Sequence, residues 1–465
     1  MRKLWIAVVG VAALCVLTSA PLIRAQAQDS GWLLTNVQIV DLERGRVLDA
    51  RTLHIRDDRI AAIVESPTAV QVAGLRTIDG QGSFVIPGLY DMHVHLVTNA
   101  AESEQAFFLE RGALPDRVLS SRIDQGVLGV RDMAFPIDSI DVLARLGRGG
   151  NGDASAVPRI WYVGPALNAP SALSVPIHAQ VADRSAVTAI VDRIAAAGGT
   201  AVKIHDRLSR ETYTQIAEAA RARGLPVVGH IPALVPIEDV IKERQRSVEH
   251  LGGLTHGILM ACSRDSAARQ RLAAAFVPED VARLVRVSMS AEHLTPLLDG
   301  FDAAQCTAVA RRLREADVWQ VPTLVLWKAW ASTAPGRASV AQLAAWQGLN
   351  RTMIDITRIL HAERVPMMAG TDNIEFAIAG GSLHDELAAL VDAVLTPLEA
   401  LRAATVEPAR FLNTAAVSGL VKPGFQADVV LLKGNPLVDI ANTRQVAGVV
   451  LRGKYHQVST VVPAR

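Results

Sequence analysis

Two histidines separated by a single residue, His93 and His95, follow the apolar run 84–90. Side chains on a strand alternate between its two faces, so both imidazoles project to the same side and can bind one cation. This spacing predicts a metal site at the end of a strand.

Four later side chains repeat the arrangement, because each follows a short, mostly apolar stretch and can bind a metal. They are Lys203, His230, His250 and Asp372. A single strand histidine is usually a packed or surface residue, and an aspartate can simply cap a helix, so the recurrence matters more than any one member. Lys203 is the unusual member, since burial of an unpaired ammonium is costly and lowers its pKa.

Eight short strand candidates, each followed by a loop and a helix, supply these positions. They span 84–92, 126–133, 159–164, 200–205, 226–230, 247–251, 318–326 and 366–371. The alternation predicts an α/β fold, a (β/α)8 TIM barrel with buried parallel strands. The active site of such a barrel lies at the C-terminal ends of its strands, where all six candidate donors fall.

Helices are expected at 183–197 and 210–223, the second capped by Ser209 and stopped by Gly224. The stretch 258–317 is rich in Ala and Arg, and we expect it to form a helical insertion at the rim of the barrel.

Short strands separated by polar turns occur near both ends of the chain, within 32–66 and 427–458. They predict one small β-sandwich domain assembled from both termini. The expected boundaries place the sandwich at 28–86 and 421–465 and the barrel at 87–420.

The N-terminus differs in kind, because Arg2 and Lys3 precede the apolar stretch 4–20, and Ala25-Gln26-Ala27 follows it. This pattern is typical of a cleaved secretory signal at 1–27, so we expect an exported protein, periplasmic or secreted, without a stable membrane anchor. A retained anchor is the alternative, although the apolar stretch is shorter than the ~20 residues of a usual span.

The 465-residue chain is 50% hydrophobic, with a formal net charge of +1 and no block of like charges. This balance argues against a nucleic-acid-binding surface and a polybasic membrane patch, and leaves a small-molecule substrate as the expected partner. A homo-oligomer stays open. In an oxidising compartment Cys262 and Cys306 can pair, but two free buried thiols fit the sequence equally well.

The donor-bearing segments together resemble the amidohydrolase superfamily, in its binuclear metal-dependent branch related to imidazolonepropionase and Xaa-Pro dipeptidase. The resemblance rests on 85–95 (VIPGLYDMHVH), 129–133 (GVRDM), 202–205 (VKIH), 229–230 (GH), 247–250 (SVEH) and 369–372 (AGTD). Further support comes from 383–387, 396–405 and 424–430. These segments are specific for the superfamily and only weakly specific for a substrate.

The resemblance implies two divalent metal ions, for which zinc suits the ligands while manganese, iron or cobalt stay open. His93, His95 and Asp372 are expected at one ion and His230 and His250 at the other. Lys203 is expected to be carboxylated, so that its carbamate oxygens bridge the two ions. A water of lowered pKa then attacks the substrate carbonyl, and Asp372 serves as the catalytic general base.

The expected enzyme is an amidohydrolase that cleaves amide or peptide C–N bonds, for example in dipeptides or N-acyl amino acids. Hydrolysis of a lactone, an ester or a cyclic amide is the alternative, and a non-catalytic metal- or ligand-binding exported protein is a third interpretation. His205 and Tyr213 are candidates for substrate binding. Purely structural roles for both are the competing interpretation.

Overall fold

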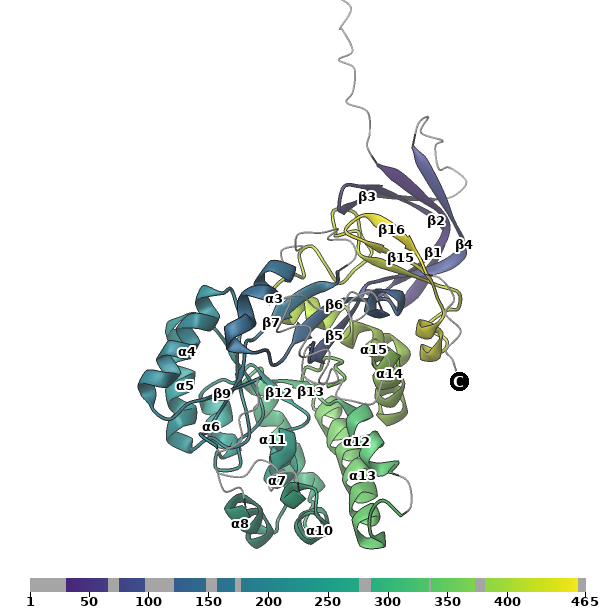
Figure 1. The fold of residues 1–465 in the computed structure, drawn as a ribbon. Coiled ribbons are helices and arrows are strands. Elements are labelled where there is room, and N and C mark those ends of the chain that lie inside the picture. The colour runs from purple at the N-terminus through teal and green to yellow at the C-terminus, as the bar shows by residue number, and fades with distance from the viewer. Residues whose placement is uncertain are drawn as a thin grey trace, which may run out of the picture.

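The computed structural model of the chain describes residues 31–65, 75–96, 121–147, 157–171, 177–275, 286–333, 336–372 and 381–458. The predicted signal peptide lies outside these residues. Within them, no helix combines the length and the apolar character that crossing a membrane requires. A β-sheet occupies one end of the molecule, and a barrel surrounded by helices occupies the other (Figure 1).

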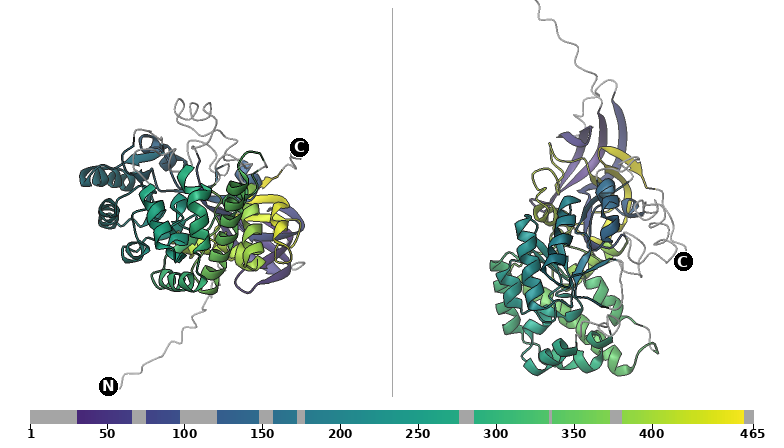
Figure 2. Two further views of the ribbon diagram at one scale, coloured as in Figure 1. Left: turned by 90° about the horizontal axis from the view of Figure 1, so that it is seen from below. Right: turned by 60° about the vertical axis from the view of Figure 1, so that its left-hand side comes forward.

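The sheet at the first end combines strands from both ends of the chain, as the sequence predicts. Its order is β16-β15-β14-β4-β1-β2-β3. The strands are β1 (Trp32–Asp41), β2 (Arg46–Arg56), β3 (Arg59–Glu65), β4 (Arg76–Pro87), β14 (Val429–Leu432), β15 (Val446–Leu451) and β16 (Lys454–Gln457). Strand β4 joins the two contributions, because it pairs with β1 on one side and with β14 on the other (Figure 2). A buried cluster that includes Leu34, Leu53, Val85 and Val429 holds the sheet together.

The second body is the predicted parallel barrel. Its strands are β5 (Leu89–Val94), β6 (Val127–Asp132), β7 (Arg159–Tyr162), β8 (Ala166–Asn168), β10 (Val202–Ile204), β11 (Val227–Gly229), β12 (Ser247–Glu249) and β13 (Trp319–Val321), with β9 (His178–Gln180) alongside β8. Residues 366–369 close the circle, since the amide of Met368 donates to the carbonyl of Gln320 at 2.9 Å and the amide of Met92 donates to the carbonyl of Ala369 at 3.0 Å.

The barrel departs from the predicted strands in three places. The candidate 84–92 is two strands in two different sheets, divided at Gly88, where a Cβ atom would lie 2.8 Å from the side chain of Leu128. The candidate 318–326 ends early because a helix begins at Leu324. The candidate 366–371 pairs through a single bridge, from Met367 to Gln320, rather than as a regular strand.

The helices cover the outside of the barrel and extend below it (Figures 1 and 2). They are α3 (Ile140–Gly147), α4 (Arg184–Ala196), α5 (Arg210–Ala222), α6 (Ile237–Lys242), α7 (Gly257–Cys262), α8 (Ser266–Ala275), α10 (Ala291–Asp299), α11 (Ala303–Glu315), α12 (Leu324–Ala331), α13 (Val340–Ala362), α14 (Gly381–Ala393), α15 (Pro397–Ala403) and α16 (Val406–Phe411). Ser209 caps α5 by accepting from the amide of Thr212, and Gly224 follows that helix with a positive φ, as predicted.

The region 258–317 is helical where the structure describes it, through α7, α8, α10 and α11. Cys262 at the end of α7 forms a disulfide with Cys306 in α11. Of the two states that the sequence leaves open, paired and free, the structure has the paired one. The disulfide links the two ends of the insertion.

Candidate metal centre

The six predicted donors come together at the C-terminal ends of the barrel strands. His93 lies in β5 with His95 directly after it, and Lys203 lies in β10. His230, His250 and Asp372 follow β11, β12 and the closing segment 366–369. Their side chains are at most 6% exposed. Polar groups this deeply enclosed need partners in the protein or a bound cation.

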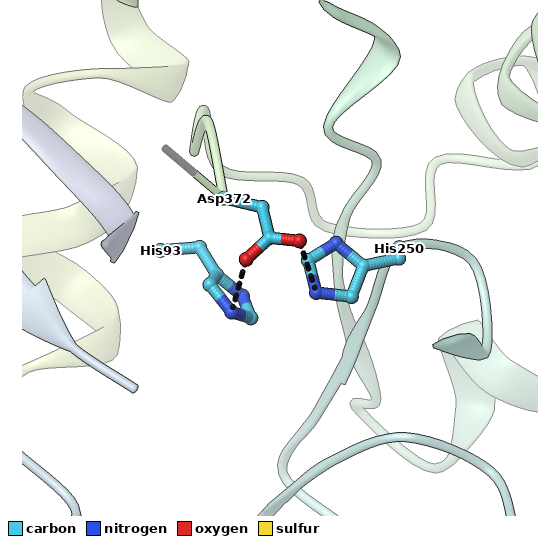
Figure 3. Close-up of side chains that lie close together, drawn as sticks. All are labelled: His93, His250 and Asp372. Atoms are coloured by element: carbon cyan, nitrogen blue, oxygen red, sulfur yellow. Dashed lines mark ion pairs between the residues drawn. The ribbon is translucent and has the colours of Figure 1, made fainter. Parts of the chain in front are cut away.

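Asp372 stands between the histidines (Figure 3). Its Oδ1 lies 3.1 Å from Nε2 of His95 and 3.5 Å from Nε2 of His93, while its Oδ2 lies 3.5 Å from Nε2 of His250. The ligand atoms of His93, His250 and Asp372 all lie within 4.8 Å of one another. This set is compact enough to hold a metal ion.

Lys203 points into the same space, with Nζ 3.3 Å from Nε2 of His93. Burial lowers the pKa of the Lys203 ammonium, against the attraction of the Asp372 and Glu249 carboxylates. The depressed pKa favours the neutral amine, which is the form that reacts with carbon dioxide to give a carbamate.

Three of the histidines are held from behind through Nδ1. The Nδ1 atom of His93 lies 2.9 Å from Oε2 of Glu249, and that of His230 lies 2.8 Å from Oδ1 of Asp206. The Nδ1 atom of His250 lies 2.9 Å from the hydroxyl of Thr323, which itself donates to a carbonyl and therefore accepts from the imidazole. A proton fixed on Nδ1 leaves Nε2 bare, and a bare Nε2 is the usual metal ligand.

The donor set fits a divalent metal ion. Nε2 of His230 is a buried atom without a hydrogen-bond partner among the described residues, and Oδ1 of Asp372 has the imidazole of His95 beside it. A bare imidazole nitrogen and a carboxylate oxygen in such positions are the ligands that zinc prefers.

Burial lowers the pKa of all four candidate histidine ligands, that of His250 to about 3, so the imidazoles are neutral near pH 7. For Asp372, burial acts in the opposite direction, but His250 and His95 outweigh it and lower the pKa to about 2. Neutral imidazoles and an ionised carboxylate are the protonation states that metal binding requires.

His250 and Asp372 both have left-handed backbone conformations, with φ of +54° and +50°. Non-glycine residues rarely adopt this region, and such strain is common at functional sites because the surrounding structure must maintain it. Both side chains are thereby turned inward where their strands end.

A second group of rings adjoins His230. The ring centre of His205 lies 4.4 Å from that of His230 and 4.5 Å from that of His178, the first residue of β9. The Oδ1 atom of Asn168 accepts from two backbone amides, so its Nδ2 faces Nδ1 of His205 at 3.3 Å. The His205 side chain is 15% exposed. It is thus more exposed than the side chain of any of the six donors, which are at most 6% exposed.

Tyr213 lies elsewhere, and this corrects the sequence prediction of a substrate-binding role. It belongs to α5, its side chain is fully buried in the core, and its hydroxyl donates to the side chain of Gln245 at 3.2 Å. The α5 helix packs its apolar face against the barrel, and Tyr213 lies on that face. The hydroxyl therefore makes a hydrogen bond inside the protein and does not reach a substrate.

Sequence reasoning passed over the residues behind the ligands: Glu249, Asp206, Thr323 and Arg131. Glu249 and Asp206 each adjoin a predicted site residue, His250 and His205, and this adjacency was the available signal. Thr323 and Arg131 lie far from their partners in sequence, so only the fold reveals the contacts.

The chain is similar to known proteins in sequence and in fold. A model of the amidohydrolase family matches residues 158–455. One similar solved structure is a prolidase in complex with N-methylphosphonate-L-proline, with 21% identity, coverage of 92% of this chain and 100% of that chain, and a TM-score of 0.66. Another is a Xaa-Pro dipeptidase with bound methionine, with 18% identity, coverage of 92% of this chain and 100% of that chain, and a TM-score of 0.66. A third is ochratoxinase from A. niger, with 17% identity, coverage of 94% of this chain and 98% of that chain, and a TM-score of 0.67. At these identities the structures share the fold. The search of curated proteins found no match.

Proposed function

Because the chain belongs to the amidohydrolase family and is therefore a hydrolase of amide bonds, we propose that it uses two metal ions to cleave dipeptides or N-acyl amino acids. The observation that carries the proposal is the convergence of four imidazoles, Asp372 and the buried Lys203 in one enclosed space.

His93, His95 and Asp372 would hold one ion, and His230 and His250 the other. The carbamate of Lys203 would lie between them, formed when the neutral amine attacks carbon dioxide, makes an N–C bond and releases one proton. Bound in this site, divalent cations such as zinc polarise a carbonyl group and lower the pKa of a water molecule toward neutrality.

Asp372 is proposed to move the proton. Its carboxylate touches the imidazoles of His95 and His250 and is ionised, so it can accept a proton from the attacking water. It would then pass that proton to the leaving nitrogen as the C–N bond breaks. Burial excludes bulk water, which strengthens the electrostatic interactions that guide this transfer.

The proposed substrate class draws on the molecules bound in the similar structures, a proline derivative in one and methionine in the other. Both are compatible with a dipeptide or an acylated amino acid. In this chain the partly exposed His205 lies beside His230, and its imidazole would donate to a substrate oxygen.

The test is a hydrolysis screen of the zinc-loaded chain on dipeptides, Xaa-Pro dipeptides, N-acyl amino acids, lactones and esters, with and without chelator. We expect about two zinc ions per chain and amide hydrolysis that the chelator abolishes. Faster turnover of lactones or esters than of every amide would support the alternative hydrolase. Stoichiometric zinc without turnover of any compound would support a binding protein instead.

We also propose that the protein is exported. The segment 1–27 has the composition of a secretory signal, and the Cys262–Cys306 disulfide is typical of an oxidising compartment. Fractionation of cells that express the full-length chain, with N-terminal sequencing of the mature protein, tests this.

A further inference from the structure

Two neighbouring charged residues of β6, Arg131 and Asp132, are buried beside the metal centre and belong to neither proposed ligand set. They are 1% and 0% exposed. Strand β6 pairs in parallel with β5, the strand that carries His93. Buried charges are expensive unless their contacts serve a purpose, so these two require an explanation.

The pairing between β5 and β6 is irregular next to His93. The pairing runs from Asp91 with Val130 to Val94 with Asp132, and a register shift lies between these pairs. His93 falls inside this interval and His95 lies just beyond it. The backbone ladder therefore does not hold the two histidines in the way that a regular strand pair would.

Arg131 fixes the N-terminal side of this interval. Its Nε donates to the carbonyl of Met92 at 2.7 Å, and its Nη2 donates to both carboxylate oxygens of Glu249 at 2.9 Å. Glu249 in turn holds Nδ1 of His93 and accepts from the hydroxyl of Ser247 at 2.5 Å. The ring of Phe411 lies 5.0 Å from the guanidinium carbon and closes the other side.

Asp132 fixes the C-terminal side. Its Oδ2 accepts from the amide of Leu96 at 2.8 Å, and Leu96 directly follows His95. Arg131 and Asp132 therefore hold the backbone on both sides of the two histidines, one by donating to Met92 and the other by accepting from Leu96.

We propose that Arg131 and Asp132 are a positioning pair that sets the orientation of His93 and His95 for metal binding. This inference rests on the proposed function, because it takes both histidines to be ligands. Arginine suits the role because its planar fork makes three directed contacts at once, whereas lysine offers one compact charge. A carboxylate suits the other role because it accepts only.

The experiment compares Arg131→Lys, Asp132→Ala and Asp132→Asn with the wild-type chain. Zinc per chain is measured by elemental analysis after dialysis against graded chelator, and kcat, KM and thermal unfolding are measured on the same samples. Glu363→Gln is the matched control, because it alters a peripheral ion pair with Arg311, whose side chain is 58% exposed.

We expect Arg131→Lys and Asp132→Ala to weaken one of the two zinc equivalents by roughly 10- to 100-fold, the usual effect of losing a contact behind a ligand. Their kcat should fall at limiting zinc and recover with excess zinc. Asp132→Asn should stay near wild type, because an amide oxygen still accepts from Leu96. The control should match the wild type in zinc content and kcat.

Folded Arg131→Lys and Asp132→Ala chains that unfold at lower temperature but bind both zinc ions with wild-type affinity would show a merely structural role, and the inference would be wrong. Loss of zinc in Asp132→Asn equal to that in Asp132→Ala would also contradict it. A wild-type chain that takes up no zinc would instead overturn the proposed function, and this inference with it.

Discussion

The two sides of the metal centre are built differently. Around His93, the side chains are sealed, and a buried ion pair between Arg131 and Glu249 lies behind the ligand. Around His230, a single carboxylate, Asp206, lies behind the ligand, and the neighbouring His205 is partly exposed. We call the first the closed side, and the second, where the His205 side chain is 15% exposed, the open side.

We propose that the two sides have different roles. The closed side holds its ligands in one orientation through several contacts each, which suits a permanent metal site. The open side offers a ring that can donate to an incoming molecule, which suits substrate entry. Asp372 stands between them, because one of its oxygens faces His93 and His95 and the other faces His250.

The largest expected effect is at the residue that joins the two sides. Asp372→Asn keeps an oxygen that can bind a metal ion but cannot accept a proton, so we expect kcat to fall by roughly 10²- to 10⁴-fold with the fold intact. Steady-state kinetics and circular dichroism of the zinc-loaded chain measure both. The control is Asp385→Asn, an exposed aspartate paired with Arg444. Turnover within a few-fold of wild type would remove Asp372 from the proposed role.

A buried carboxyl group near His250 should make stability depend on pH. Glu386 in α14 is fully buried and accepts from the amide of Val325 at 2.8 Å, next to the turn where Thr323 holds His250. Burial raises its pKa from 4.5 to about 8, against the backbone amides of Val325 and Leu324. The folded chain therefore keeps a proton that the unfolded chain releases, and stability should fall as pH rises from about 4.5 to about 8.

Glu386→Gln removes this ionisation and keeps an acceptor for Val325. Relative to wild type, the variant should gain stability at pH 9 over its value at pH 5, by up to a few kcal/mol, since one pKa unit corresponds to roughly 1.4 kcal/mol. Urea unfolding of both metal-free chains at the two pH values measures the gain. Glu363→Gln serves as the control. An equal difference at both pH values would show that Glu386 does not ionise in this range.

A smaller effect, on zinc affinity, should distinguish the open side from the closed side. Asp206→Ala removes the carboxylate behind His230, and we expect the affinity for one zinc equivalent to fall by roughly 10- to 100-fold. Competition with a chromogenic chelator measures each equivalent. Asp138→Ala, at a residue paired with Arg193 and 88% exposed, is the control. If Asp206→Ala retained both zinc ions at full affinity, the open side would not depend on this contact.

Much of the barrel and the convergence of the six candidate donors could be predicted from the sequence because both follow local rules. Buried parallel strands are short apolar runs, and donors at their ends converge once the strands form one barrel. The split at Gly88 was missed because the apolar run continues across it, although the chain passes there from one sheet to the next.

The contacts behind the ligands could not be predicted in the same way. Arg131 and Glu249 are 118 residues apart, and each stands within a segment that reads as an ordinary strand. The prediction that Tyr213 binds substrate was wrong because it considered only the position of Tyr213 in the sequence. The structure shows that the face of α5 that carries Tyr213 is buried. Both outcomes depend on packing between distant elements.

The smallest expected effect concerns the open side alone. His205→Gln removes a 15% exposed imidazole that belongs to neither proposed ligand set, so zinc content should stay at the wild-type value. KM should rise by roughly 2- to 10-fold, the value of one net hydrogen bond, with a smaller change in kcat. Gln180→Ala provides the control, since this exposed side chain near His178 bonds only to the backbone of Ser171 among the contacts described. If His205→Gln lost zinc instead, its ring would support the ligand His230, and the open side would be part of the metal site and not an entrance to it.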